Sequence, residues 1–457
     1  MAIIADTLAV IKSNPLALLG GAGRVDECFT HVGHVWRDRV LTPARTMKLF
    51  ILQVLHGNTA ISHLSHLSDT DVASSSYCEA RARLPLAGVA AATTELCCDG
   101  ARDSDSAAKW LGRRVLMTDA TAVTAPDTPA LQQMWPQPGA QKKGCGFPAL
   151  KLLALLNLAS GMIVQVTMMC LNVHEMSQLA GPHAALHRGD VLLGDRAFCS
   201  FAHLVLLAAM SVDAVFRTHQ AQIIDFTPHR PYRRKKGGKN GKHYQKGLPT
   251  SRFIRRLGEE DQIVEWFRPV NRPVWMSKRD YAALPETLEV RELRYRITAR
   301  GMRTRRVSIT TTLLDSMRYP KREIARLYGL RWEIETNFRH MKTTMGMQKL
   351  KCQTPDGVMK ELMIFALVYN LIRAAMMQAA ERQGIDNANR VSFIDAARWL
   401  RSMTVHSNRM MPELIVNPPR KGRWCPRVLK RRPKEYDRMN KPRSEYLEPL
   451  TETEVTN

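Results

Sequence analysis

The sequence lacks the features that mark an extracellular or membrane protein. Its nine cysteines form no C-x-x-C pair and share no spacing with nearby histidines, so neither a disulfide framework nor a zinc site is expected. Residues 1–12 contain Asp6 and have no basic lead-in, which argues against a signal peptide. The two longest apolar stretches, residues 147–171 and 362–377, are interrupted by polar and charged side chains. These absences favour a soluble protein of a reducing cytoplasm, with no membrane partner.

Acidic residues are scarce as well. The chain of 457 residues has 42 Asp and Glu against 67 Lys and Arg, which gives a net charge of +25 and a pI of about 10.0. An excess of this size favours a polyanionic partner, bound through phosphate contacts and counterion release. The composition, 45% hydrophobic and 24% charged, is otherwise typical of a globular protein. The length indicates two or three domains.

The apolar patterns predict an α/β protein. Residues 1–110 have helical patterns, and they form either a DNA-binding domain or a helical domain that only packs or dimerises. From residue 112, short apolar runs predict three strands, a helix, a strand, a helix and a strand. A mixed sheet flanked by helices in this order is the arrangement of a ribonuclease-H-like catalytic core.

Two aspartates follow apolar runs of this core. Asp119 comes after the run at 115–117, and Asp195 comes after the run at 191–193. We expect the two runs to be neighbouring strands, with both aspartates at the strand ends. Most acidic residues in any protein are structural, so position and spacing are what single these two out.

A basic stretch interrupts the core after residue 219. No acidic residue lies between Arg230 and Arg256, and glycines in the middle predict turns or a loop. Strand-like alternation follows, so residues 220–315 are expected to be an inserted β-rich subdomain with a basic loop. The alternative is an ordinary solvated surface. The cations expected to meet DNA are Arg233, Arg234, Lys235 and Lys236.

Residues 322–346 predict a helix with one chemically rich face. Tyr328, Arg331, Glu335 and Lys342 stand at offsets 0, 3, 7 and 14, so their directions fall within about 60° on a helical wheel. Arg331–Glu335 and Glu335–Arg339 can equally be i,i+4 ion pairs on a solvated helix. With a following core helix this segment spans 316–385, and residues 386–457 are expected to be a helical segment and a basic tail.

The pattern Tyr-x₂-Arg-x₃-Glu-x₆-Lys resembles the signature of insertion-sequence family four, the YREK group of bacterial DDE transposases. Asp119 begins Asp-Ala-Thr-Ala-Val, which is similar to the family's first strand, although Gly is usual after the aspartate. Residues 193–198 (LGDRAF) resemble the segment around its second aspartate. The resemblance extends over about residues 30–435, and the inserted subdomain lies where the family has it.

This resemblance implies a DNA transposase. Asp119, Asp195 and Glu335 would be the catalytic residues and would hold Mg²⁺, as two ions, with Mn²⁺ as a substitute. The partners would be double-stranded DNA, namely the terminal repeats of the element and the target, bound by a homodimer. The protein would act in the bacterial cytoplasm at the nucleoid. Two alternatives stay open: a nuclease of the same fold without strand transfer, and a catalytically inactive DNA-binding derivative.

In the resembled family, Tyr328, Arg331 and Lys342 would grip DNA around a flipped base. Such a base needs an aromatic partner on which to stack. This sequence has no aromatic residue between Tyr295 and Tyr319, where the family layout leads one to look. We therefore predict Trp275 as the stacking residue, with Trp266 as the next choice. Whether a hairpin intermediate is formed stays open.

Overall fold

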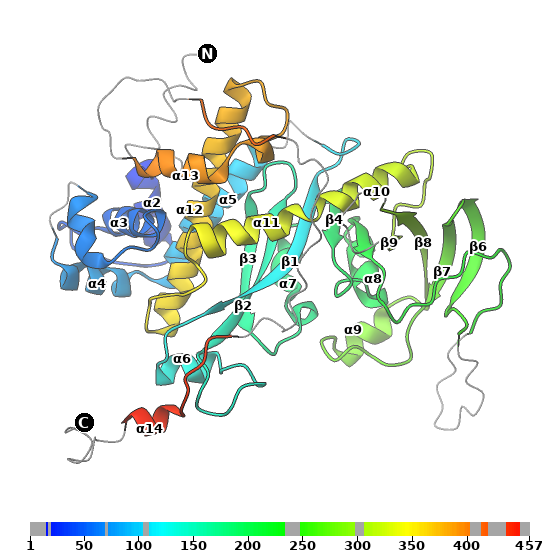
Figure 1. The fold of residues 1–457 in the computed structure, drawn as a ribbon, viewed down its shortest axis with the longest axis horizontal. Coiled ribbons are helices and arrows are strands. Elements are labelled where there is room, and N and C mark those ends of the chain that lie inside the picture. The colour runs from blue at the N-terminus through cyan, green and yellow to red at the C-terminus, as the bar shows by residue number, and fades with distance from the viewer. Residues whose placement is uncertain are drawn as a thin grey trace.

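One mixed sheet runs through the protein, with most of the helices gathered at one end (Figure 1). The computed structural model describes residues 15–16, 20–68, 72–103, 109–233, 247–297, 306–402, 413–418 and 436–447, with the backbone alone for 95–103. The strands are β1 (Val115–Thr124), β2 (Ala149–Asn157), β3 (Ile163–Cys170), β4 (Val191–Gly194), β5 (Asp213–Arg217), β6 (Ser251–Gly258), β7 (Asp261–Phe267), β8 (Thr287–Arg296) and β9 (Arg306–Thr311).

The helices frame this sheet. The N-terminal ones are α2 (Gly21–His31), α3 (Pro43–Leu55), η2 (Ile61–His66), α4 (Ser74–Arg83) and α5 (Leu86–Asp103). Within the sheet region lie α6 (Pro129–Met134), η4 (Glu175–Gln178), α7 (Ala180–Ala184), α8 (Phe201–Ala209) and α9 (Lys278–Ala283). The C-terminal ones are α10 (Lys321–Leu330), α11 (Glu333–Arg339), the π-helical turn η5 (His340–Thr344), α12 (Pro355–Arg382), η6 (Ala388–Arg390), α13 (Phe393–Arg401) and α14 (Arg443–Leu447).

The first five strands confirm the predicted fold class. They stand in the order β3-β2-β1-β4-β5. β2 is antiparallel to both of its neighbours, whereas β1, β4 and β5 are parallel to one another. This order and these directions are those of a ribonuclease-H-like sheet. The second and third predicted strands, β2 and β3, form a hairpin, with Gly161 in the turn at a φ of +68°.

The strands of the predicted insert continue the same sheet. β9 pairs antiparallel with β5, and β8, β7 and β6 follow outward. β7, β8 and β9 lie where strand-like alternation follows the basic stretch, as expected of a β-rich insert. β6 was not predicted, because its residues belong to the basic stretch that was expected to be a loop. Ser251–Gly258 pairs antiparallel with β7 through two register shifts, and Arg252 lies 2.9 Å from Glu265 across this pair.

Alternation along the strands gives the sheet two apolar faces. Met117, Leu193 and Val215 belong to a large core that also includes residues of α3, α10, α11, α12 and α13. Leu192 and Phe216, one position away, belong to a second core with α8. Because side chains alternate with period two, odd-numbered positions of β1, β4 and β5 face the helices α10 to α12.

The helix α12 is the centre of the larger core. It is the one described helix long and apolar enough to cross a membrane, with a mean hydropathy of 1.5 over eighteen residues, but 78% of that window is buried in the protein. It packs against α3, α5, α13 and β3. Arg373 in α12 is buried and donates to the Ser160 carbonyl in the β2–β3 turn and to Asn389 Oδ1, at 2.6 Å.

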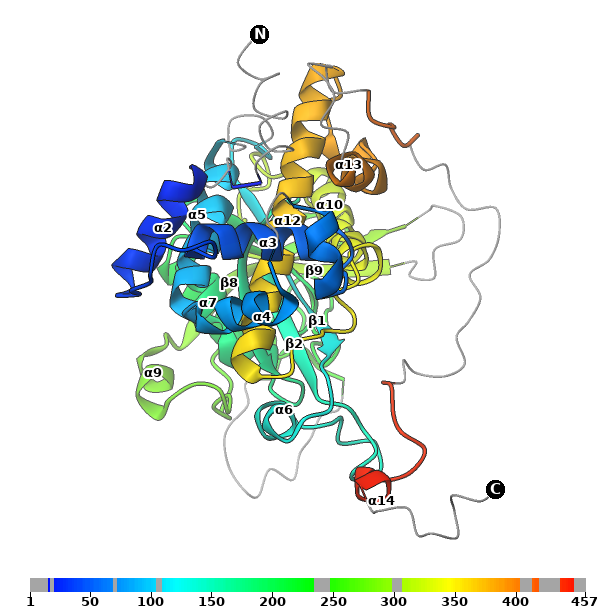
Figure 2. The same ribbon diagram turned by 90° about the vertical axis from the view of Figure 1, so that its left-hand side faces the viewer.

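The N-terminal helices attach to α12. α3 begins after Thr42, whose hydroxyl accepts from the Arg45 amide, and Pro43 occupies its first turn. Asn58 Nδ2 donates to Glu361 Oε1 at 2.6 Å, a buried contact between this region and α12. Figure 2 views the molecule from this end, with α3 and α4 in front of α12. This packing accords with a structural role, while a role in DNA binding stays a prediction.

Candidate active site

Asp119 lies in the middle of a strand. The prediction that it ends one was wrong, because β1 continues to Thr124 through its pairing with β2, in which Asp119 stands opposite Ala154. Asp195 directly follows β4, as predicted. The last paired positions of β1 and β4 are Met117 and Leu193, so both aspartates lie two residues further on. They therefore share the face of the sheet that carries α10 to α12.

The predicted helix 322–346 is divided in two and ends in a π-helical turn. α10 ends at Leu330 and α11 begins at Glu333, while Arg331 and Trp332 keep right-handed helical φ and ψ. Hydrogen bonds of the i,i+3 type tighten this joint: the Arg331 amide donates to the Tyr328 carbonyl at 3.1 Å, and the Ile334 amide donates to the Arg331 carbonyl at 3.2 Å. A pattern of apolar residues does not distinguish these turns from an unbroken α-helix.

Arg331 joins the strand to the helix. Its Nη1 lies 3.2 Å from Asp119 Oδ2, and its Nη2 lies 3.2 Å from Glu335 Oε1. The Arg331 side chain is 15% exposed, against 23% for Asp119 and 40% for Glu335. The predicted i,i+4 pair of Arg331 and Glu335 is thus present, but it faces the sheet. Arg331 also contacts Asp119, which is 212 residues away in the sequence.

The carboxylates of this site act on one another. Burial is the main reason that the pKa of Asp119 is raised to about 6; the negative charges of Asp195 and Glu335 act in the same direction, against the opposing effects of the Ala120 amide and Arg331. Asp119 Oδ1 accepts from the Ala120 amide at 2.8 Å, and Asp195 Oδ1 accepts from the Ala197 amide at 2.8 Å. The three acids therefore share one electrostatic environment.

Tyr328 belongs to the same cluster. Its ring centre lies 5.9 Å from the guanidinium carbon of Arg331. Burial raises the pKa of Tyr328 to about 12, with a smaller raising effect from Asp195. Lys342, the fourth residue of the predicted face, lies further along the chain in the π-helical turn η5 and is half-buried.

Oxygen ligands dominate this cluster. No group of three or more His, Cys, Asp or Glu stands ready-made for a metal ion in the part of the chain that the structure describes, and the Arg331 guanidinium lies between Asp119 and Glu335. Carboxylate oxygens are nonetheless the ligands that Mg²⁺ and Mn²⁺ prefer. A carboxylate whose pKa is raised by burial and by two neighbouring acids is stabilised by a nearby cation, so the residues fit a divalent ion.

Arg217 is a neighbour that the sequence patterns did not single out. It ends β5, the strand beside β4, and its charge lowers the pKa of Tyr328. Its place at the carboxyl end of a strand next to the Asp195 strand is the signal that could have marked it.

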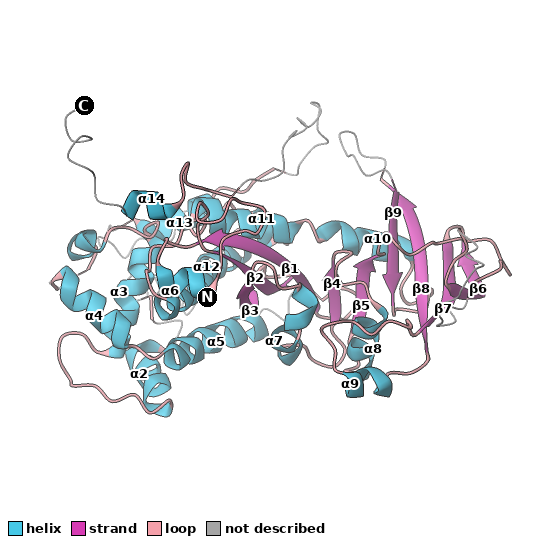
Figure 3. Ribbon diagram, turned by 90° about the horizontal axis from the view of Figure 1, so that it is seen from below, coloured by secondary structure: helices cyan, strands magenta, loops and turns pink. Residues whose placement is uncertain are grey.

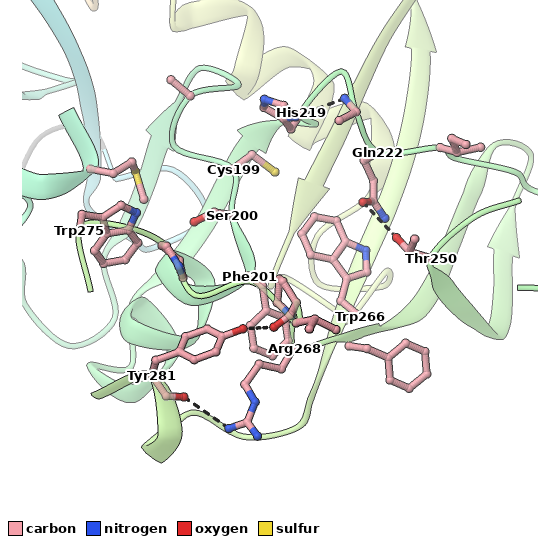
Figure 4. A pocket seen from close by; sticks show the side chains of 18 of the residues that line it. Cys199, Ser200, Phe201, His219, Gln222, Thr250, Trp266, Arg268, Trp275 and Tyr281 are labelled. Atoms are coloured by element: carbon pink, nitrogen blue, oxygen red, sulfur yellow. Dashed lines mark hydrogen bonds between the residues drawn. The ribbon is translucent and has the colours of Figure 1, made fainter. Parts of the chain in front are cut away.

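Three of the residues considered for DNA contacts in the insert line a larger cavity. Its volume is about 770 Å³, and Arg233, Trp266 and Trp275 are among its lining residues (Figure 4). Trp266 is buried and donates from Nε1 to Glu292 Oε1 at 2.9 Å, which indicates a structural role. Trp275 is half-buried. Arg234, Lys235 and Lys236 lie outside the described residues.

Comparison with known proteins decides the family. A profile described as the transposase DDE domain matches residues 110–371, which is more than half of the chain and includes all three acids. The chain belongs to the DDE transposase family. It is 27% identical to the transposase InsG for insertion sequence element IS4 of Escherichia coli (strain K12), over 72% of this chain and 70% of that protein. This similarity confirms the resemblance to insertion-sequence family four.

A solved structure is also similar to this transposase. It is the cryo-EM structure of a piggyBac transposase synaptic complex with hairpin DNA, at 8% identity and a TM-score of 0.44, covering 85% of this chain and 79% of that one. Membership of the family makes the protein a DNA transposase, an enzyme class that cleaves DNA and transfers strands with divalent metal ions.

Proposed function

We propose that this transposase carries out both reactions at Asp119, Asp195 and Glu335, with Mg²⁺ as the physiological ion and Mn²⁺ as a substitute. The observation that carries the proposal is the convergence of the three acids. Arg331 contacts Asp119 and Glu335 at 3.2 Å each, and Asp195 and Glu335 both raise the pKa of Asp119.

The chemistry follows from the ligand set. Bound divalent ions supply an activated water or hydroxyl and stabilise charge on the leaving oxygen. Asp119, Asp195 and Glu335 would hold these ions by carboxylate oxygens. Arg331 has several N–H donors and contacts Asp119 and Glu335. Bound ions would neutralise these carboxylates, and the guanidinium could then donate to a DNA phosphate instead. The reaction would be hydrolysis followed by attack of a 3′-hydroxyl, without a covalent protein intermediate.

Residues outside the three acids would bind the DNA. Tyr328 and Lys342 would hold phosphates beside the ions, and the basic segment Arg233–Lys236 would hold the duplex. Trp275 would stack on an unpaired base. Residues 1–110 would bind the terminal repeats, and two protomers would pair two ends, because each end needs its own site. We place the protein at the nucleoid of the bacterial cytoplasm.

The test is a set of size-conserving substitutions. Asp119→Asn, Asp195→Asn and Glu335→Gln each remove one negative ligand, so nicking and joining should both fall by roughly 10³-fold or more, while DNA binding survives. The assay uses a labelled terminal repeat in Mg²⁺ and a pre-cut 3′ end for joining. Pre-cut ends that wild type cannot join would indicate a nuclease without strand transfer.

Glu323→Gln is the matched control. Glu323 lies on α10, where it contacts Arg326 at 3.4 Å on the surface. Glu333 is less suitable, because its charge acts on the buried Arg373. Cleavage by Glu335→Gln at close to the wild-type rate would refute the assignment, and Glu335 would then be only an ion-pair partner of Arg331.

A further inference from the structure

A smaller cavity beyond Asp195 is lined by arginines. Its volume is about 180 Å³, and its guanidinium groups come from four places in the sheet region. They belong to Arg196 after β4, Arg217 at the end of β5, Arg294 in β8 and Arg306 in β9. No acidic side chain is among the described residues that line it. We call the cavity that these four residues line the arginine cavity.

Neighbouring side chains hold two of the four arginines in place. Arg196 Nη1 donates to Gln220 Oε1 at 2.8 Å. Arg294 Nε donates to Ser308 Oγ at 3.0 Å, and Arg294 Nη1 lies 3.6 Å from Glu260. Thus Glu260 offsets one positive charge in part, while Gln220 and Ser308 are neutral. The cavity therefore has an excess of positive charge, and hydrogen bonds fix the side chains of Arg196 and Arg294 in place.

The arginine cavity adjoins the proposed active site. Arg196 is the residue that follows Asp195 in the chain. Arg217 lies near enough to Tyr328 to lower its pKa, and the charge of Asp195 acts on the same group in the opposite direction. The cavity and the acids are therefore consecutive features along the same edge of the sheet, one of them positive and the other negative.

We propose that the arginine cavity binds a single backbone phosphate of the DNA strand that is cut at Asp119, Asp195 and Glu335. The proposal rests on the proposed function for the position of that strand. Guanidinium groups bind phosphate oxygens in a fork geometry, and the hydroxyl of Ser308 adds a neutral donor. A volume of about 180 Å³ is below the range of roughly 300–1,000 Å³ in which small-molecule ligands bind, and suits one charged group.

The experiment couples one arginine to one phosphate. Arg306 is exposed at the start of β9, so Arg306→Gln should fold normally. Terminal-repeat DNA is prepared with one methylphosphonate at a time, which removes the charge of a single phosphate. Binding is measured in EDTA for wild type, Arg306→Gln, Arg306→Lys and the control Arg279→Gln, an exposed arginine of α9 in the same insert.

At one position near the cleavage site, the methylphosphonate should weaken binding of wild type and Arg279→Gln by about tenfold, the effect of removing one charge-assisted hydrogen bond. The same substitution should have little further effect on Arg306→Gln, with Arg306→Lys in between. The slope of log K against log salt should become shallower by about 1 in Arg306→Gln. Equal effects of every methylphosphonate on all four proteins would overturn the proposal.

Two further arms identify the source of failure. Inorganic phosphate that stabilises wild type but not Arg306→Gln, with no coupled position in the DNA, would mean that the cavity takes free phosphate, which also overturns the proposal. Cleavage by Glu335→Gln is measured in parallel. If no phosphate position is coupled to Arg306 and Glu335→Gln is inactive, only the proposal for the arginine cavity is refuted. If Glu335→Gln is active, the proposed active site is refuted.

Discussion

A single guanidinium contacts two of the three acids of the site and offsets their charge only in part. Arg331 contacts Asp119 and Glu335, yet the pKa of Asp119 stays raised at about 6 because burial and two neighbouring carboxylates outweigh that contact. The sequence places a carboxylate here that is unfavourable in the folded protein at neutral pH. Such local cost is typical of functional sites, where the ligand supplies the missing compensation.

Stability in the absence of metal should reveal that cost. The folded pKa of Asp119 is above its unfolded value of 3.8, so its contribution to stability is fully present below pH 3.8 and is lost as pH rises through about 6. At about 1.4 kcal/mol per pKa unit, the loss is at most about 3 kcal/mol. Asp119→Asn removes the charge and should make the metal-free protein more stable at pH 7–8, with a smaller gain near pH 4.

Urea unfolding in EDTA at several pH values measures this difference. Mg²⁺ should then stabilise wild type more than Asp119→Asn, because the ion binds the native site and the variant lacks a ligand. A metal-free Asp119→Asn protein that is less stable than wild type at pH 8 would show that the Arg331 contact outweighs the burial of Asp119.

The role of Trp275 can be tested in the same assays of DNA processing. Trp275 is half-buried at the larger cavity, so it is more accessible to a base than the buried Trp266. Trp275→Ala should leave the first nick intact and reduce any hairpin product by about tenfold or more, since stacking contributes roughly 1–3 kcal/mol per base. Trp275→Phe should retain most of the effect. A folded Trp275→Ala protein with unchanged products would reject the assignment.

At the scale of elements, the joint between α10 and α11 is held by its surroundings rather than by its own sequence. Gly329 lowers helix stability just before the joint, and a Cβ added there meets nothing within 4 Å. The exposed Trp332 follows on the other side. The backbone nonetheless stays helical, because Arg331 is fixed to β1 through Asp119.

Two glycine substitutions should therefore have opposite signs. Gly329→Ala should raise the free energy of unfolding by about 0.5–1 kcal/mol, because it favours the helix without a clash. Gly161→Ala should lower it by roughly 1–3 kcal/mol, because Gly161 has a φ of +68° and its Cβ would lie 2.3 Å from Arg373 Nη2. Thermal and urea unfolding of both variants measure this, and a destabilising Gly329→Ala would show that the joint needs the glycine.

The elements differ in how far the sequence predicts them. The short apolar runs before Asp119 and Asp195 correctly predicted neighbouring strands, since burial on both faces of a strand gives a continuous apolar run. The end of β1 was missed because pairing with β2, a tertiary effect, extends it through polar residues. β6 was missed for the same reason. The contact between Arg331 and Asp119 spans 212 residues, so no local pattern contains it, and only the resemblance linked the two.

At the scale of the whole molecule, one sheet connects the proposed active site to the insert. Figure 3 shows the strands continuing from β1 past β4 and β5 to β6, with most of the helices at the opposite end and α8, α9 and α10 beside the strands. Phe216 of β5 pairs with Thr310 of β9, and Arg291 of β8 forms a buried ion pair with Asp261 at 2.5 Å. If the insert binds DNA as proposed, that DNA is held on the same sheet that carries Asp119 and Asp195.

The net charge of +25 makes DNA affinity depend on salt, and the basic segment of the insert should supply part of that dependence. Arg233 differs from its neighbours there, because its backbone amide donates to the Pro249 carbonyl at 2.9 Å and its side chain lines the larger cavity. We therefore expect the triple change of Arg234, Lys235 and Lys236 to Gln to weaken binding without sequence preference.

Each phosphate that the variant no longer neutralises should make the slope of log K against log salt shallower by about 0.9, so the triple variant should lose up to about 3 units of slope. Fluorescence anisotropy in EDTA with specific and scrambled duplexes measures both slopes. Arg382 and Arg390, exposed at the far end of α12 and in η6, provide the control as a double Gln variant. If the triple and control variants change the slope equally per charge removed, the basic segment contributes only to the net charge. The long-range electrostatic field of the protein depends little on where a surface cation lies. If the triple variant alone flattens the slope, these cations meet phosphates directly.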